Sequence, residues 1–182
     1  MMKTLFLQPP SFGGFDGGAG SRYQAKREIR SFWYPTWLAQ AAALVPDSKL
    51  IDSIPHGIRM PDIVKEIGDY DLAVLHTSSP SFPDDVKAVA ALKSANPRLK
   101  AGFVGAKVAV QPDESLKYSE VVDFVARNEF DFTIKELADG RDWSAIDGLS
   151  FRNPNGAIVV CGPGSAPKRP SCAASASGPT TV

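Results

Sequence analysis

The sequence predicts an α/β protein with a flavodoxin-like (Rossmann-like), doubly wound, five-stranded parallel sheet in the order 2-1-3-4-5, followed by a β-hairpin and a disordered tail. Short apolar runs that stop at Pro, Ser or Gly alternate with segments of helical spacing. This alternation is typical of buried parallel strands joined by crossover helices. The chain has 182 residues, 43% of them hydrophobic, which is enough for one domain with its own core.

The strands are predicted from runs of consecutive apolar residues. Three pure runs, at 3–8, 72–77 and 100–105, should form the buried strands 1, 3 and 4. Less pure runs at 49–54 and 121–126 should form strands 2 and 5. We expect these two strands at the edges of the sheet, where polar side chains are tolerated.

The helices are predicted from apolar residues spaced three or four apart and from proline in the first turn. The clearest helix is 83–97, in which Asp84 and Asp85 favour the N-terminal end of the helix dipole and Pro97 follows the last turn. Its inward face should carry Val86, Val89, Ala90 and Leu92. The other helices are expected at 35–45, 61–70, 113–118 and 131–140.

The alternation ends after Gly140. Residues 149–160 predict a β-hairpin, because Asn155-Gly156 suits a tight turn between two apolar runs. From 162 to 182, 17 of 21 residues are Gly, Pro, Ser, Ala or Thr, so no core can form there, as in a truncated or frameshifted end. The predicted parts are a domain at 1–148, the hairpin at 149–161 and a disordered tail at 162–182.

Charge and cysteine content exclude several classes of protein. Lys+Arg and Asp+Glu both count 20, so nothing indicates a nucleic-acid or acidic-membrane partner. The apolar stretch before Pro9 is too short for a signal peptide, and no run could span a membrane, which predicts a cytoplasmic protein. Cys161 and Cys172 lack metal-site spacing, so we expect neither a zinc site nor a disulfide framework.

A ligand in such a sheet binds at the carboxyl ends of the strands, at the switch point between strands 1 and 3. Thr77, Ser78 and Ser79 follow strand 3, and Gly105 and Ala106 follow strand 4. Hydroxyls and glycine suit a large, neutral to mildly anionic ligand that takes many modest hydrogen bonds. The serines could equally cap the next helix.

Three other ligand classes do not fit the strand ends. A dinucleotide motif fails because Tyr23 stands where the third glycine of GxGxxG would be. A phosphate-binding GxxxxGK[ST] loop fails because Ala19 follows Gly18. A phosphoacceptor receiver fails because Thr77 replaces the acceptor aspartate.

Four stretches together resemble one family. They are MKTLFLQPPSF (2–12), FWYPTWLAQAAALV (32–45), YDLAVLHTSSPSF (70–82) and VVDFVARNEFDFTIKELADG (121–140). They resemble the N-terminal cobalamin (B12)-binding domain of B12-dependent radical SAM proteins, above all the hopanoid-biosynthesis-associated ones. The resemblance covers residues 2–160 and is specific over the first 40 and around 70–82.

The resemblance implies a set of cobalamin contacts. They are Gln8, Pro9, Thr77, Ser78, Ser79, Gly105, Ala106 and Glu129. The family's Arg-Gly-Glu signature after strand 5 is Arg127-Asn128-Glu129 here. Asparagine can replace the glycine if that position needs a left-handed backbone.

The resemblance also implies what the chain lacks. In the DxHxxG motif that places a histidine under cobalt, Gly18 holds the histidine position, and we expect His56 and His76 to be structural. Cobalt would therefore have no protein histidine ligand. The CxxxCxxC motif is absent; in the family it holds a [4Fe-4S] cluster, and this cluster cleaves S-adenosylmethionine. The cluster and S-adenosylmethionine are therefore expected only in the full-length parent.

We therefore predict a cobalamin-binding fragment of a radical SAM enzyme of hopanoid side-chain biosynthesis, inactive alone. Its expected partners are cobalamin and the parent's radical SAM domain, against which the aromatic stretch 21–37 would pack. The alternative is a flavodoxin-like ligand- or protein-interaction domain with no corrin.

Overall fold

The computed structural model describes residues 1–10 and 34–162. Its sheet has the strand order β2-β1-β3-β4-β5-β6-β7. The strands are β1 (Thr4–Gln8), β2 (Lys49–Asp52), β3 (Leu72–His76), β4 (Lys100–Val104), β5 (Phe124–Ala126), β6 (Leu149–Arg152) and β7 (Ile158–Val160). The helices are α1 (Thr36–Leu44), α2 (Met60–Glu66), α3 (Phe82–Ala95), α4 (Ala106–Val110), α5 (Pro112–Tyr118) and α6 (Phe130–Ala138), with short 3-10 turns at Ile67–Asp69 and Trp143–Ala145.

The prediction of an α/β fold with a mostly parallel sheet is confirmed, but the predicted five strands and their order are wrong for the whole sheet. The sheet has seven strands, because the hairpin β6-β7 continues it beyond β5. β6 pairs antiparallel with β5, and β7 pairs antiparallel with β6. The prediction that the fifth strand lies at an edge of the sheet is therefore wrong, because β5 lies between β4 and β6. Its second edge is paired, which satisfies backbone groups that would otherwise be open.

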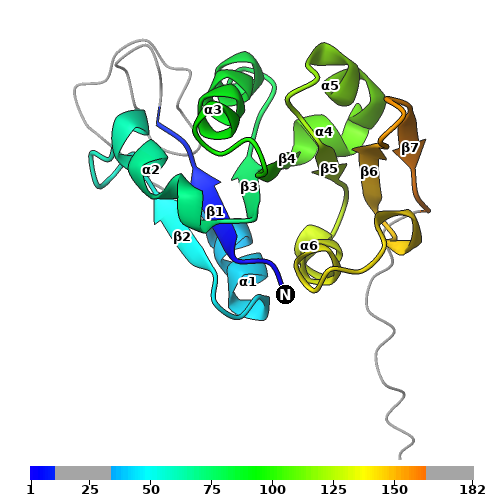
Figure 1. Ribbon diagram of the computed structural model, residues 1–182, viewed down its shortest axis with the longest axis horizontal. Coiled ribbons are helices and arrows are strands. Elements are labelled where there is room, and N and C mark those ends of the chain that lie inside the picture. Colours follow the sequence, from blue (N-terminus) through cyan, green and yellow to red (C-terminus); the bar gives the residue numbers. More distant parts are fainter. Residues whose placement is uncertain (11–33, 163–182) are drawn as a thin grey trace, which may run out of the picture.

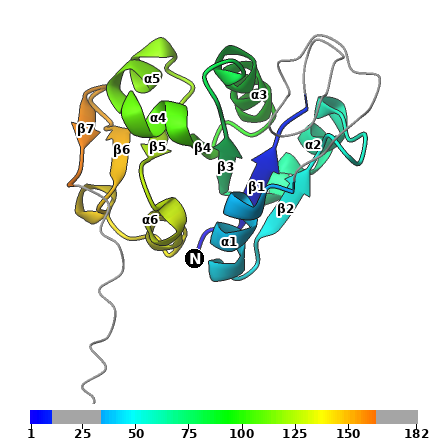
Figure 2. The ribbon, with the colours of Figure 1, turned by 180° about the vertical axis from the view of Figure 1, so that it is seen from behind.

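Helices cover both faces of the sheet (Figures 1 and 2). α2, α3, α4 and α5 lie on one face and α1 and α6 on the other. The side chains of each strand alternate between these two cores. In β1, Leu5 and Leu7 belong to the first core, whereas Phe6 belongs to the second.

The helices broadly follow the predicted ranges. α4 was not predicted, because its five residues are too few to show a helical period. In α3, Val86, Val89 and Leu92 are buried as expected, but Ala90 is only partly buried. No helix among residues 1–10 and 34–162 is long and apolar enough to cross a membrane.

The predicted hairpin is confirmed, with a five-residue connection between β6 and β7. Gly156 has a φ of 81°, the left-handed conformation expected of it. The side chain of Asn153 holds the turn, since its Oδ1 accepts hydrogen bonds from the backbone N–H groups of Asn155 and Ala157. The predicted tail falls, apart from Gly162, outside the described residues.

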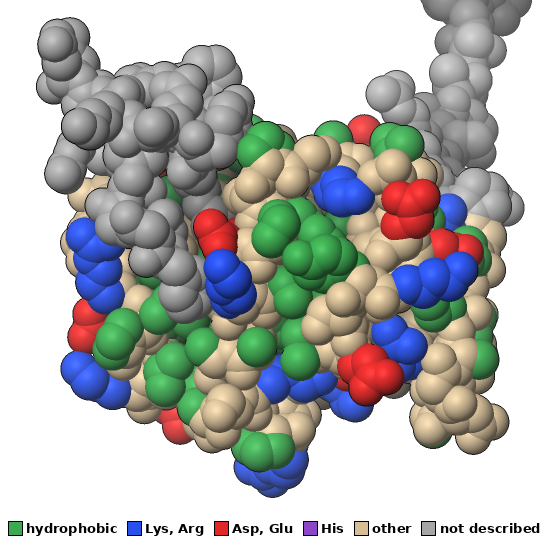
Figure 3. Space-filling view, turned by 90° about the horizontal axis from the view of Figure 1, so that it is seen from above, with side chains coloured by type: hydrophobic (Ala, Val, Ile, Leu, Met, Phe, Trp, Pro, Cys, Tyr) green, Lys and Arg blue, Asp and Glu red, His purple; other side chains and the backbone are tan. Residues whose placement is uncertain are grey.

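The outer face of the α3–α5 layer carries an apolar patch (Figure 3). Hydrophobic side chains gather near the middle of this face, with acidic and basic side chains around them. Tyr118 is 58% exposed and its ring meets that of Phe82 at 5.2 Å, edge to face. Nζ of Lys107 lies over the Phe82 ring, 5.5 Å from its centroid.

Candidate functional site

The carboxyl ends of β1, β3, β4 and β5 meet at one edge of the sheet, because these strands run parallel. The chain leaves β1 toward β2 on one side and reaches β3 on the other, so the topological switch point lies between β1 and β3. The predicted contact residues end these four strands or follow them, so the fold brings them to one edge.

The end of β1 is buried. Gln8 is 1% exposed, and Pro9 and Pro10 after it are also buried. Within residues 1–10 and 34–162, nothing forms a hydrogen bond with Oε1 of Gln8. A buried oxygen without a partner is costly, so this atom is a candidate ligand contact.

The side chain of Thr77, the first predicted hydroxyl contact, is buried in the protein interior. Its side chain is 1% exposed, and Oγ1 donates a 2.7 Å hydrogen bond to Oδ2 of Asp85, which is fully buried. Its backbone N–H donates to the carbonyl oxygen of Val104 at 3.0 Å. Thr77 therefore joins β3, β4 and α3 and presents no hydroxyl at the surface.

The serines after Thr77 differ in whether their hydroxyl groups are free to bind a ligand. Ser78 is partly buried, and its Oγ lies 2.9 Å from Oγ of Ser81, which also accepts the Ser78 N–H at 3.1 Å. Ser79 is exposed, and among the described residues its hydroxyl forms no hydrogen bond. Ser81 is the N-cap residue of α3, yet its side chain makes no capping bond. The serines thus order the loop, and Ser79 alone offers a hydroxyl to solvent.

Thr77→Val and Ser79→Ala should therefore have different effects. We expect Thr77→Val to lower the free energy of unfolding by about 2 kcal/mol, because a buried carboxylate loses a hydrogen-bond donor. Ser79→Ala should leave stability within about 0.5 kcal/mol. If Ser79 contacts a ligand, its loss should weaken binding about five-fold. Urea unfolding and ligand titration of both variants measure these effects, and a stability loss confined to Ser79→Ala would contradict them.

Gly105 and Ala106 continue this edge after β4. Gly105 has a φ of 122°, and a Cβ there would lie 2.3 Å from the carbonyl oxygen of Thr77. This contact within the protein already explains the glycine, without any ligand. Ala106 is exposed, and it begins the five-residue helix α4.

The Arg127-Asn128-Glu129 signature follows β5, and its first residue forms hydrogen bonds to the hairpin end. Arg127 donates through Nη2 to the carbonyl oxygens of Cys161 and Gly162, at 2.9 Å in the second case, and so ties β5 to the end of the hairpin. Asn128 has a φ of 55°, which confirms the left-handed backbone that would make asparagine acceptable there. Glu129 is exposed at the start of α6.

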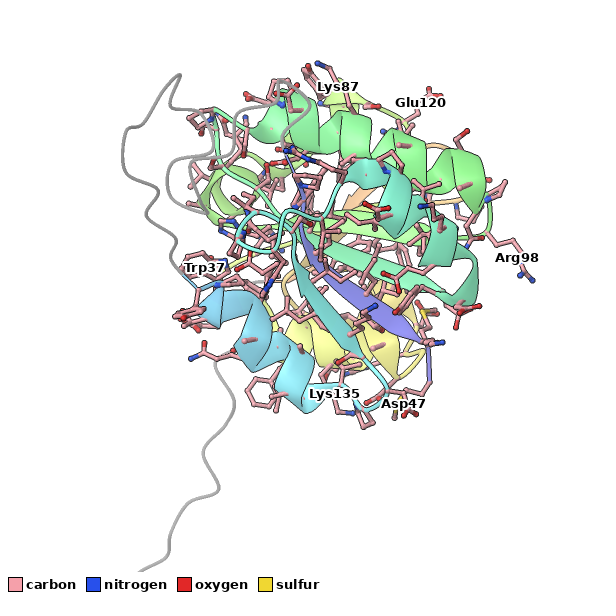
Figure 4. All side chains as sticks on the ribbon, turned by 90° about the vertical axis from the view of Figure 1, so that its left-hand side faces the viewer. Trp37, Asp47, Lys87, Arg98, Glu120 and Lys135 are labelled. Atoms are coloured by element: carbon pink, nitrogen blue, oxygen red, sulfur yellow. The ribbon has the colours of Figure 1, made fainter. Side chains whose placement is uncertain are left out.

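Both histidines lie near this edge but in different surroundings. His76 ends β3, and its ring centroid is 5.0 Å from that of Trp37 near the start of α1. Figure 4 shows Trp37 at the end of the molecule opposite Arg98, which precedes β4. His56 is exposed after β2. Within the described part of the chain, no group of three or more His, Cys, Asp and Glu side chains could hold a metal ion.

Two cavities flank the sheet. One, of about 390 Å³, lies along β2 and is lined by Thr36, Leu50, Asp52 and His56 among others. The other, of about 480 Å³, lies between Trp143, Phe151 and the starts of β4 and β5, away from the carboxyl edge. Only the first cavity adjoins the candidate site, because Asp52 pairs with Gln8 in the sheet register.

Burial raises the pKa of Asp52, and the nearby His56 opposes part of this rise. The folded chain then binds the proton of Asp52 more tightly than the unfolded chain does. The contribution of Asp52 to stability therefore falls as pH rises from the ordinary pKa of 3.8 to the raised one.

Asp52→Asn should consequently stabilise the protein at neutral pH but not at a pH below 3.8. The gain should be less than about 1 kcal/mol, because the side chain is partly exposed and water screens its charge. Thermal melting of both proteins at the two pH values measures it. A difference that does not change with pH would contradict the expectation.

Sequence reasoning missed three residues of this edge. In the sequence, Trp37 belongs to the aromatic stretch 21–37 that is predicted to pack against the radical SAM domain, and Asp52 and Asp85 have no predicted role beyond strand 2 and the start of a helix. Only Asp85 carried a usable signal, an acidic residue on the inward side of a helix, which requires a buried partner.

No protein-family model matches the chain. An uncharacterized methyltransferase of Pyrococcus horikoshii is 29% identical over 167 residues, which cover 87% of this chain and 34% of that protein. The chain thus spans about a third of the length of this relative.

Two solved structures share the architecture. The radical S-adenosylmethionine methyltransferase TsrM from Kitasatospora setae, with cobalamin and a [4Fe-4S] cluster bound, matches 91% of this chain and 30% of its own, with a TM-score of 0.66 and 13% identity. The cobalamin-dependent S-adenosylmethionine radical enzyme OxsB, with aqua-cobalamin bound, matches 90% of this chain and 22% of its own, with a TM-score of 0.63 and 12% identity. The chain therefore has a fold that is also found in two cobalamin-containing radical enzymes.

Proposed function

We propose that this chain is a cobalamin-binding domain of a longer B12-dependent radical SAM protein, with the corrin on the carboxyl edge of β1, β3, β4 and β5. The observation that carries the proposal is the composition of this edge. The segments that follow β3 and β4 begin with short, uncharged residues, Thr77-Ser78-Ser79 and Gly105-Ala106, and of these Ser79 and Ala106 are exposed. A large, nearly neutral ring system needs such a platform. The cobalamin present in TsrM and in OxsB supports this choice of ligand.

The residues at the edge suit the many amide groups of cobalamin. Ser79 can donate or accept a hydrogen bond, and the carboxylate of Glu129 and Oε1 of Gln8 can accept from amide N–H groups. The exposed methyl group of Ala106 leaves room for the ring. Bound cobalamin supplies a cobalt atom that can carry a methyl group, in keeping with a relative that is named a methyltransferase. The His76 ring packs against the Trp37 ring, and we keep the prediction that no protein histidine ligates cobalt.

The [4Fe-4S] cluster and S-adenosylmethionine would belong to the rest of the longer protein. This chain has two cysteines, whereas the cluster motif needs three. The proposed partner is accordingly a radical SAM domain in the same parent protein. The hopanoid role stays a prediction, because neither the methyltransferase relative nor TsrM nor OxsB is named for it.

Gel filtration of the 182-residue chain with hydroxocobalamin tests the proposal. We expect visible absorbance to elute with the protein in a one-to-one ratio after free ligand is removed. A folded but colourless protein would contradict cobalamin binding and would favour the flavodoxin-like domain with no corrin.

A further inference from the structure

Among the described residues, several buried polar atoms near the carboxyl edge lack a hydrogen-bond partner, and two of them belong to residues beside His76. Oε1 of Gln8 and Nε1 of Trp37 are both shielded from solvent, and neither forms a hydrogen bond with any residue that the structure describes. Buried polar atoms are nearly always paired, since an unpaired one loses its hydration without compensation. Two such atoms close to a proposed ligand edge indicate that something else pairs with them.

Both atoms belong to the α1 side of the sheet. Gln8 follows Phe6 by two positions, so it faces the same core as Phe6, the one that α1 and α6 cover. His76 follows Val74 by two positions and faces that core as well. Trp37 packs against the same core, and its ring contacts the His76 ring at a tilt of 40°.

The sheet register brings the two residues to the same strand ends. Leu7 of β1 pairs with Leu75 of β3, so Gln8 and His76, one position further along, are neighbours on adjacent strands. Because the Trp37 ring packs against the His76 ring, tilted by 40°, the indole and the Gln8 side chain adjoin the same histidine. One small group could therefore contact both of them.

The two atoms have complementary requirements. Oε1 of Gln8 accepts a hydrogen bond, whereas Nε1–H of Trp37 only donates one. A primary carboxamide satisfies both, since its NH₂ group donates and its oxygen accepts. Water could also bridge them, but the corrin ring carries several primary amides on flexible arms.

We propose that Gln8 and Trp37 together bind one primary carboxamide side chain of the corrin, on the α1 side of the carboxyl edge. The assignment rests on the proposed cobalamin-binding function and names a contact within that same site. Trp37 thereby becomes a binding residue that also reports occupancy, because a bound corrin should quench its fluorescence.

Titration of the chain with hydroxocobalamin and with cobinamide tests the assignment. Cobinamide keeps the corrin amides and lacks the nucleotide tail. Trp37→Phe removes the N–H but keeps a ring against His76, and Gln8→Met removes the acceptor at similar length. Each should raise the dissociation constants of both ligands about five-fold. The double variant should lose clearly less than the product of the two effects, because both residues hold the same group.

Trp143→Phe is the matched control, since Trp143 lies in the 3-10 turn before β6, with its ring 5.7 Å from that of Phe124. It should leave both dissociation constants unchanged. Without ligand, Trp37→Phe should melt no lower than the unaltered chain, because it removes an unpaired buried N–H. A purely structural Trp37 would instead lower the melting temperature.

The outcomes separate the inference from the function on which it rests. If the unaltered chain binds cobalamin and neither Trp37→Phe nor Gln8→Met weakens binding, the carboxamide contact is wrong and the proposed function stands. If Trp37→Phe weakens cobalamin binding but not cobinamide binding, the contact is to the nucleotide tail and the assignment is wrong. If the unaltered chain binds neither ligand, the proposed function fails and the contact fails with it.

Discussion

An Ala106→Trp variant should fail to retain cobalamin while folding as the unaltered chain does. Ala106 is exposed at the start of α4, two positions after the end of β4, so an indole there would occupy the surface on which the corrin is proposed to lie. We expect at least about 100-fold weaker binding, equivalent to about 3 kcal/mol. Because the side chain points to solvent, the free energy of unfolding should change by about 0.5 kcal/mol or less.

Ala43→Trp is the control for this change. Ala43 is exposed near the end of α1, whose start lies at the carboxyl edge, so the same substitution there stays away from the proposed site. Equilibrium titration should give unchanged cobalamin binding for Ala43→Trp. Tight binding by Ala106→Trp would show that the ligand does not cover the end of β4.

Gly105→Ala should destabilise the protein strongly, although substitution of the neighbouring Ala106 should not. The added Cβ would lie 2.3 Å from the Thr77 carbonyl oxygen, and a φ of 122° is a conformation that side chains rarely adopt. We expect a loss of about 3 kcal/mol or more, which lowers the melting temperature by roughly 6–12 °C in a chain of this size.

Gly68→Ala is the matched control for Gly105→Ala. A Cβ at Gly68 would meet no atom within 4 Å, and its backbone is not left-handed. Thermal melting should therefore show little change or a small gain for Gly68→Ala. Equal melting temperatures for Gly105→Ala and Gly68→Ala would contradict the close contact between residue 105 and the carbonyl oxygen of Thr77.

Apolar runs predict strands well because burial in a covered parallel sheet requires them, and all five predicted runs contain a strand. Pairing is harder to predict. The run at 149–160 indicated a hairpin, but nothing local shows that its first strand adds to the outer edge of β5. That choice depends on an open edge that exists only after the parallel strands have assembled.

The place of the candidate residues on the sheet could be predicted, but the state of their side chains could not. Strand order places Thr77, Ser79 and Ala106 at one edge, whichever ligand is bound. Whether a hydroxyl is available depends on partners distant in the fold, and the hydroxyl of Thr77, one of the predicted contacts, already donates a hydrogen bond to Asp85. Unpaired atoms such as Nε1 of Trp37 become visible only when burial and hydrogen bonding are known together.

Hydrogen–deuterium exchange with and without hydroxocobalamin tests the central claim most directly, because it shows where the ligand contacts the chain. We predict slower exchange in the segments that follow β3, β4 and β5, at residues 76–82, 104–108 and 126–130. Residues 96–100 and 119–123, which precede β4 and β5 at the opposite edge, should exchange at unchanged rates. Protection confined to that opposite edge, or no protection at saturating ligand, would contradict a cobalamin site on the carboxyl edge of the sheet.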